Sequence, residues 1–355
     1  MQHKMTSKHE AINPIHESVE GKLDPTFVKI YREQVANTPN NTKIDLATLR
    51  KTYSSSYSYR QAPAPEISNV KDIKFKSFDG AEIILRIYRP NDAKPDELLP
   101  VHIDFHGGGW GLGDLDTEVH ILKHYVANSR IVVIDVDYRL IPEVPFPSGL
   151  KDCFEAVKFV YSHAEELNVN RNSISVGGVS AGGNISLAVD HLCRDEGIKL
   201  VLVCAGTPQI SDIQNISKAD ESPYKSMKEF EFAPTLNWAR LKWFDTMKWS
   251  SFNQLPEKEK EQKIKEIGWF KSILDAPNWE NLTKTVIFTA GCDPMRDEGE
   301  TYCKKLIDYG NEVVFKRFPG VPHPFMHMDK DLWQAQEFIK LTSRELAIAH
   351  GTLHI

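Results

Sequence analysis

Cysteine is scarce in this sequence, and its spacing argues against sites that depend on paired thiols. The 355 residues include five cysteines, and no two of them form a Cys-x-x-Cys pair. Disulfide frameworks and structural zinc sites normally use an even number of cysteines at short spacings. We therefore expect reduced thiols in a cytoplasmic protein. The five are Cys153, Cys193, Cys204, Cys292 and Cys303.

Long apolar runs and an excess of basic charge are also missing. No stretch approaches the roughly 20 apolar residues that a membrane-spanning helix needs, and residues 1–10 lack the apolar core of a signal peptide. Lys and Arg number 43 against 49 Asp and Glu, which gives a net charge of −6 and a pI near 6.1. Proteins that bind nucleic acid usually present a basic patch. We expect neither a nucleic-acid partner nor a membrane span.

Nucleotide-binding loops are absent as well, although three adjacent glycines follow an apolar run at residues 101–105. In His106-Gly107-Gly108-Gly109-Trp110, a dinucleotide loop would need another glycine at position 112, where Leu112 stands, and no phosphate-loop pattern follows. Backbone without side chains instead lets a substrate carbonyl approach N–H donors. We predict an oxyanion hole made by the amides of Gly108, Gly109 and Ala181, with Gly107 as a further candidate.

A serine between glycines lies where a strand is predicted to turn into a helix. Residues 173–176 form a short apolar run, and residues 184–193 carry apolar side chains at helical spacing. In Gly178-Val179-Ser180-Ala181-Gly182, the turn would force the serine into a sparsely populated backbone conformation. Positions two before and two after it must then lack a Cβ atom, as Gly178 and Gly182 do. The pattern predicts Ser180 as a nucleophile, although the bare pentapeptide also occurs in ordinary turns.

A nucleophilic serine needs a base and an acid that orients the base. Asp293 follows the β-rich run at residues 285–289, so it lies at the same sheet edge as Ser180. Its rivals, Asp297 and Glu298, fall in the first turn of the next helix, where acidic residues complement the helix dipole. His323 lies between two prolines in a loop after another predicted strand. The order Ser180, Asp293, His323 along the chain is the one expected for α/β-hydrolases.

These motifs resemble the hormone-sensitive-lipase-like branch of the α/β-hydrolase family of carboxylesterases and lipases. The resemblance implies Ser180 as nucleophile, Asp293 as acid, His323 as base and the glycines after His106 as part of the oxyanion hole. The sequence differs from many members of the family at Val179, where an acidic or small polar residue is common. The matching segments are His106-Gly107-Gly108-Gly109-Trp110, Asp137-Tyr138-Arg139-Leu140, Gly178-Val179-Ser180-Ala181-Gly182-Gly183-Asn184, Asp293-Pro294-Met295-Arg296-Asp297-Glu298 and Gly320-Val321-Pro322-His323-Pro324-Phe325.

The order of predicted elements indicates an α/β fold with a mostly parallel, eight-stranded sheet covered by helices on both faces. A hairpin opens it, because Asp79-Gly80 separates two strand-like runs. Strands are expected at residues 73–78, 82–88, 101–105, 131–136, 173–176, 200–204, 285–289 and 313–318. Helices are expected at residues 25–35, 45–53, 117–128, 149–166, 184–195 and 297–309.

Two segments do not belong to the predicted sheet. Residues 1–65 contain two helical patterns and a linker from residue 54, and residues 207–276 form a long insertion rich in Phe and Trp. The family resemblance implies that both cover the active site as a helical cap on a catalytic domain at residues 66–355. The aromatic side chains either pack the insertion onto the sheet or line a substrate pocket. Trp110, Trp243 and Trp249 are the candidate substrate-binding residues.

The sequence therefore predicts a serine hydrolase that cleaves a small-molecule carboxylic ester, including a lactone or small acyl ester. An amidase or formamidase with the same triad is an alternative, and so is a non-catalytic small-molecule receptor on this fold. We expect no cofactor and no metal, because Pro324 separates His323 from His327 and no acidic ligand completes a zinc pattern. A homodimer is one candidate assembly.

Overall fold

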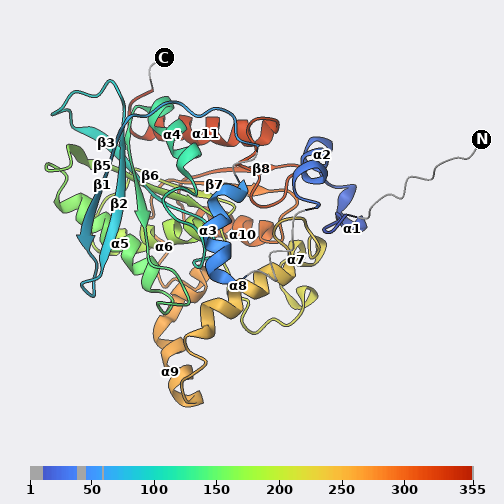
Figure 1. Ribbon diagram of the computed structural model, residues 1–355. Coiled ribbons are helices and arrows are strands. Elements are labelled where there is room, and N and C mark those ends of the chain that lie inside the picture. The colour runs from blue at the N-terminus through green and yellow to red at the C-terminus, as the bar shows by residue number, and fades with distance from the viewer. Residues whose placement is uncertain (1–10, 38–44, 58–59, 354–355) are drawn as a thin grey trace, which may run out of the picture.

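An eight-stranded sheet forms the centre of the computed structural model, which describes residues 11–37, 45–57 and 60–353 (Figure 1). The spatial order is β1-β2-β4-β3-β5-β6-β7-β8. Strand β2 is antiparallel to both of its neighbours, and every pairing from β4 to β8 is parallel. The strands are β1 (Asn69–Lys76), β2 (Glu82–Arg89), β3 (Leu99–Phe105), β4 (Val132–Asp137), β5 (Val169–Val179), β6 (Leu202–Gly206), β7 (Thr285–Ala290) and β8 (Val313–Phe318).

Helices cover both faces of the sheet, as the alternation of elements predicts (Figure 1). Helices α4 (Val119–Ser129) and α11 (Trp333–Ala349) pack on one face, where Leu122 and Phe338 share a buried cluster with Val133 of β4. Helices α5 (Ser148–Ser162), α6 (Ala181–Asp195) and α10 (Arg296–Asp308) cover the other face, with Ile134 of β4 in their cluster. Neighbouring residues of a strand point to opposite faces, so an apolar strand serves both clusters.

The remaining helices lie outside these two layers. The amino-terminal ones are α1 (Glu17–Glu20), α2 (Pro25–Gln34) and α3 (Leu46–Tyr57), and the insertion holds α7 (Lys225–Glu229), α8 (Trp238–Ser250) and α9 (Glu257–Ile267). Leu49 and Tyr53 of α3 pack with Leu112 against Trp243 and Phe244 of α8. The amino-terminal segment and the insertion therefore meet beside the loop that follows β3.

The predicted strands and hairpin are confirmed, but two helix predictions need correction. Helix α3 continues to Tyr57, into the segment predicted as a linker from residue 54, because Leu49 and Tyr53 anchor it by packing. Helix α11 was not predicted at all, although it buries Phe338 and Leu346. The prediction for residues 1–10 lies outside the described residues. Within the described ranges, every helix is too short or too polar to cross a membrane.

Candidate active site

Ser180 lies at the turn between β5 and α6, as predicted. Its backbone has φ 59° and ψ −115°, a conformation that side-chain-bearing residues rarely adopt. The Ser180 N–H donates to the carbonyl of Gly206 over 2.8 Å, and Asn184 N–H donates to the Ser180 carbonyl over 3.0 Å. These bonds to β6 and to the first turn of α6 hold the residue in the strained conformation.

The two glycines around Ser180 are required by a close contact with β3. A Cβ atom on Gly182 would lie 1.7 Å from the Phe105 carbonyl oxygen, and one on Gly178 would lie 2.2 Å from the same oxygen. Neither clash can be relieved by a rotamer change, because the obstacle is backbone. The sequence argument that these positions must lack a Cβ atom therefore has a specific cause.

His323 and Asp293 form a buried pair at the carboxyl ends of β7 and β8. Nδ1 of His323 lies 3.0 Å from Oδ2 of Asp293, and the two side chains are 7% and 1% exposed. The other carboxylate oxygen, Oδ1, accepts from the Met295 N–H over 2.9 Å. A carboxylate held in this way fixes the orientation of the imidazole.

The rival acids have other partners. Asp297 accepts from the Ser226 N–H over 2.8 Å, and Glu298 accepts from the Ile210 N–H over 2.8 Å. Both lie in the first turn of α10, and burial raises the pKa of Glu298 to about 8. A carboxyl that stays protonated near neutral pH is poorly suited to stabilise an imidazolium.

His327, four residues beyond His323, points to a different partner. Its Nε2 lies 3.3 Å from Oε2 of Glu118, whose Oε1 accepts from the Gly107 N–H over 3.3 Å. Both side chains are 3% exposed. Sequence reasoning missed Glu118, which has no motif around it. Because Gly107 donates to Glu118, its N–H is directed away from a substrate.

The three other predicted oxyanion donors lie together. Gly108, Gly109 and Ala181 line one pocket with Ser180 and His323. Gly108 has φ 120°, and a Cβ atom there would lie 2.2 Å from the Leu112 carbonyl oxygen. This loop conformation therefore depends on glycine.

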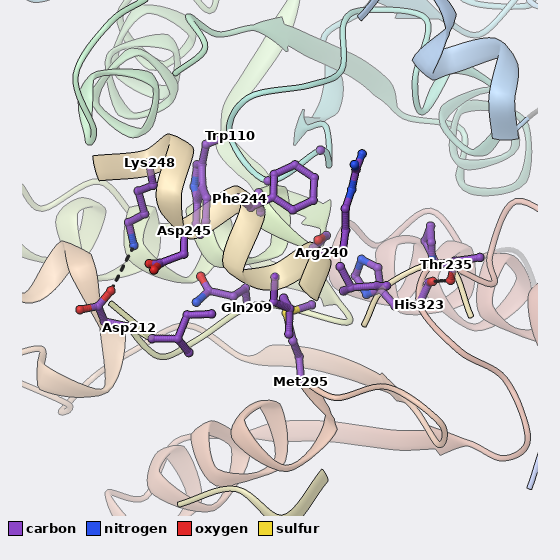
Figure 2. Close-up of a pocket in the computed structure, with 18 of the residues that line it drawn as sticks. Trp110, Gln209, Asp212, Thr235, Arg240, Phe244, Asp245, Lys248, Met295 and His323 are labelled. Atoms are coloured by element: carbon purple, nitrogen blue, oxygen red, sulfur yellow. Dashed lines mark hydrogen bonds and ion pairs between the residues drawn. The ribbon is translucent and has the colours of Figure 1, made fainter. Parts of the chain in front are cut away.

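The pocket over Ser180 draws its walls from segments far apart in the sequence (Figure 2). Tyr53 comes from α3, Trp110 from the glycine loop, and Phe244 from α8. Helix α8 also contributes three charged residues that sequence reasoning did not single out, and the loop after β6 adds two polar ones. These five are Arg240, Asp245, Lys248, Gln209 and Asp212.

Of the three tryptophans predicted to bind substrate, Trp110 lines this pocket. Trp243 and Trp249 are not among the described residues that line it. Trp243 packs edge-on against Phe244, with ring centroids 4.9 Å apart, and Trp249 is 3% exposed and donates its Nε1–H to Asp245 over 3.0 Å. Both support residues of the wall, so the aromatic composition of the insertion identified the correct segment, but these two side chains do not line the pocket.

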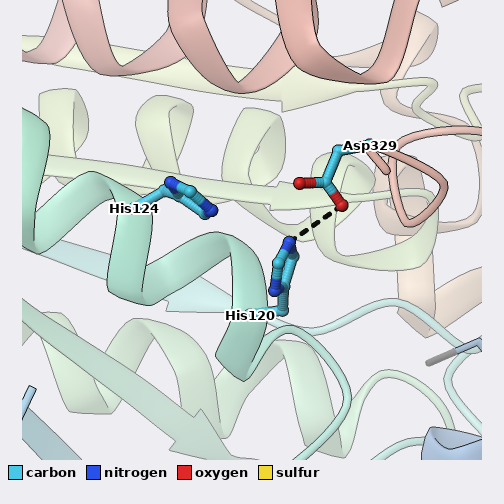
Figure 3. Close-up of side chains that lie close together, drawn as sticks. All are labelled: His120, His124 and Asp329. Carbon is cyan, nitrogen blue, oxygen red and sulfur yellow. Dashed lines mark hydrogen bonds and ion pairs between the residues drawn. The ribbon is translucent and has the colours of Figure 1, made fainter. Parts of the chain in front are cut away.

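A group of possible metal ligands lies away from this pocket. His120 and His124, one turn apart on α4, approach Asp329 so that one ligand atom of each lies within 4.8 Å of the others (Figure 3). Nε2 of His120 lies 2.9 Å from Oδ1 of Asp329, which also accepts from the Ala62 N–H over 3.1 Å. The His120–Asp329 pair links α4 to the segment before α11.

Comparisons with known proteins support the fold described above. A family model described as the alpha/beta hydrolase fold matches residues 102–327. An AB hydrolase superfamily protein of Schizosaccharomyces pombe is 33% identical over 90% of this chain and 92% of its own length. The Mycobacterium tuberculosis carboxylesterase NlhH is 32% identical over 78% of this chain and 81% of its own. A hyperthermophilic esterase structure from Pyrobaculum calidifontis superimposes with a TM-score of 0.79 at 28% identity, covering 92% and 98% of the two chains.

The contact with Phe105 predicts that Gly182→Ala destabilises the protein. We expect a loss of about 3 kcal/mol or more in the free energy of unfolding, because backbone must move to admit the methyl group. Gly21→Ala is the control, since its Cβ atom would meet nothing within 4 Å. It should change stability by less than about 0.5 kcal/mol. Urea denaturation measures both, and equal stability of the two variants would contradict the assigned contact.

The different partners of the two histidines predict different losses of activity. His323→Gln should reduce ester turnover by about 10⁴-fold or more, because the variant lacks a group able to take the serine proton. His327→Gln should keep at least a tenth of wild-type turnover, since an amide can still donate to Glu118. Melting temperatures establish that both variants are folded. A folded His327→Gln variant with the larger loss would assign the base to His327.

Proposed function

The chain belongs to the α/β-hydrolase fold family, in the hormone-sensitive-lipase-like branch, and we propose that it hydrolyses carboxylic esters through an acyl-enzyme on Ser180. The observation that carries this proposal is that Ser180, in its strained turn, and the His323–Asp293 pair meet at one pocket. A carboxylesterase and an esterase among the similar proteins support the same reaction class.

His323 acts as the general base in this proposal. Its Nδ1–H donates to Asp293, which leaves Nε2 to take the proton from Ser180. The serine oxygen then bonds to the ester carbonyl carbon, the bond to the alcohol oxygen breaks, and His323 returns the proton to that oxygen. Water repeats the sequence on the acyl-enzyme and releases the acid.

The amides of Gly108, Gly109 and Ala181 stabilise the charge on the carbonyl oxygen in both steps. Ala181 is the first residue of α6, so the amino-terminal end of that helix adds a favourable dipole. Donors fixed by the fold cost little reorganisation when the charge forms, which is the main reason such sites accelerate acyl transfer.

Amide cleavage uses the same groups, so an amidase or formamidase remains the second candidate activity. The receptor alternative is weaker, because relatives that only bind a ligand are expected to lack a member of the triad, and this sequence carries Ser180, Asp293 and His323. Turnover of a short p-nitrophenyl ester against the matching anilide separates the three alternatives.

We also propose that residues 1–65 and 207–276 form a cap over the catalytic domain. Tyr53 of α3 and Phe244 of α8 line the pocket, and the two helices pack against each other. Such residues select substrates without touching the bond that breaks. The five buried, unpaired cysteines support a cytoplasmic location, and a homodimer stays a prediction.

Ser180→Ala should reduce kcat for a short p-nitrophenyl ester by about 10⁴- to 10⁶-fold. The change removes one hydroxyl group, so melting temperature should stay near that of the wild type. A serine-directed phosphonate should label Ser180 in the wild type, as read by peptide mass spectrometry, and EDTA should leave turnover unchanged. A folded variant that kept a tenth of wild-type activity would disprove the assignment.

Phe244→Ala should broaden the range of acyl chains that the enzyme accepts. A Cβ atom built on Gly109 would lie 2.3 Å from the Phe244 ring, so the ring packs directly on the oxyanion loop. Its removal should raise kcat/KM for long-chain relative to short-chain esters by about tenfold, which is the low end of what one methylene group contributes in an apolar pocket. Phe232→Ala is the control, because Phe232 is 48% exposed and stacks on His16. An unchanged chain-length profile in Phe244→Ala would argue against a selecting role for α8.

A further inference from the structure

Lys248 is a buried cation in the wall of the pocket. The residue is 3% exposed, and its ammonium group lies over three aromatic rings. The distances from Nζ to the ring centroids are 4.9 Å for Trp110, 4.4 Å for Phe146 and 4.9 Å for Trp249. The rings stabilise the charge on three sides but accept no conventional hydrogen bond.

The oxygen contacts of this ammonium group are long. Nζ lies 3.5 Å from the Lys271 carbonyl oxygen and 4.0 Å from Oδ1 of Asp212. A charge-assisted N–H···O bond normally measures 2.7–2.9 Å, and an ammonium group has three donors. Burial lowers the pKa of Lys248 and raises the pKa of Asp212, as expected for charges that are incompletely solvated.

Two acidic groups near this pair have other partners. Asp245 accepts from Lys242 Nζ over 2.9 Å and from Trp249 Nε1 over 3.0 Å. Glu298 accepts from the Ile210 N–H, and its pKa of about 8 leaves it mostly protonated at neutral pH. Lys248 and Asp212 therefore form a pair with no net charge at the wall of the pocket.

We propose that Lys248 and Asp212 together bind a hydroxyl group on the acyl chain of the substrate. An oxygen atom about 2.8 Å from each partner spans a 4.0 Å separation at an angle near 90°, accepting from Lys248 and donating to Asp212. An added carboxylate would be repelled by Asp212, and an added ammonium by Lys248. A plain alkyl chain would offer neither ion a further hydrogen bond, although among the described residues Lys248 has only long oxygen contacts and Asp212 accepts only a long bond from the Gln214 N–H, over 3.4 Å.

The pair lies on the acyl side of the site. Figure 2 shows Lys248 and Asp212 at one end of the pocket and His323 at the other. The alcohol that leaves must be near His323, which returns its proton, so the acyl chain extends away from His323. The preferred substrates are therefore esters of hydroxy acids, an inference that rests on the proposed esterase function.

The test compares activated aryl esters of ω-hydroxyalkanoic acids with alkanoic esters of the same chain length, over a series of lengths. Wild-type protein should prefer the hydroxy ester at one length by about tenfold or more in kcat/KM, since a site built for a hydroxyl disfavours its absence. Lys248→Met, which keeps the length of the side chain, should abolish that preference. Lys305→Met should keep it, because Lys305 makes a similar contact outside the pocket, 4.3 Å above Trp279 and 2.6 Å from the Leu274 carbonyl.

Three results would overturn the proposal: no hydroxyl preference at any length, a preference that persists in folded Lys248→Met, or a stronger preference for a terminal carboxylate or ammonium. Failure of the esterase function is distinguishable, because it would appear as loss of turnover and of phosphonate labelling with every ester. Calorimetric titration of the Ser180→Ala protein with the same ester pairs then decides the proposal by binding alone. Equal affinities for the hydroxy and alkanoic esters would refute it.

Discussion

The active site depends on the contact between the carboxyl end of β3 and the turn that carries Ser180. Phe105 pairs with Gly178 in the parallel sheet, and its carbonyl oxygen reaches the position where Gly182 would carry a Cβ atom. The glycine loop begins at the next residue after Phe105. The same contact that requires glycine in the turn therefore brings the oxyanion loop beside Ser180 and Ala181, so nucleophile and donors share one backbone junction.

A second buried link connects this junction to the loop of the base. Glu118 accepts from the Gly107 N–H with one oxygen and lies 3.3 Å from His327 with the other. Burial raises the pKa of Glu118 and lowers the pKa of His327, so both shifts favour the uncharged forms of this close, buried pair. Removing one partner would leave a buried polar group of the other without its neighbour, which is more costly than losing a contact at the surface. The geometry of the glycine loop and of the His323 loop is thus coupled through residues that need not contact substrate.

The features predictable from sequence are those set by local pattern. Apolar runs predicted the strands. The turn around Ser180 predicted that Gly178 and Gly182 must lack a Cβ atom, and the close approach of the Phe105 carbonyl oxygen is the reason. Helix α11 escaped because no capping side chain and no acidic first turn mark its start after Leu332. Glu118 and Lys248 escaped for a different reason, since an isolated charged residue reads as solvated until tertiary packing buries it. Trp243 and Trp249 lie in the predicted aromatic insertion, on α8, but the residues of that helix that line the pocket include Phe244 and Lys248.

The proposed catalytic residues and the proposed substrate-selecting residues therefore lie in parts of the chain that are held in place by different interactions. Ser180, Asp293 and His323 lie at strand ends, where backbone hydrogen bonds of the sheet fix their positions. The residues of α3 and α8 that we propose to select substrates are held mainly by side-chain packing, as in the cluster that holds Tyr53 and Phe244. Substitutions in such packing change shape by small steps and leave the sheet unchanged. The buried pair of Lys248 and Asp212 differs from this apolar packing, because few other side chains could replace two buried charged groups. In our proposal, the polarity of the pair restricts which acyl chains the pocket accepts.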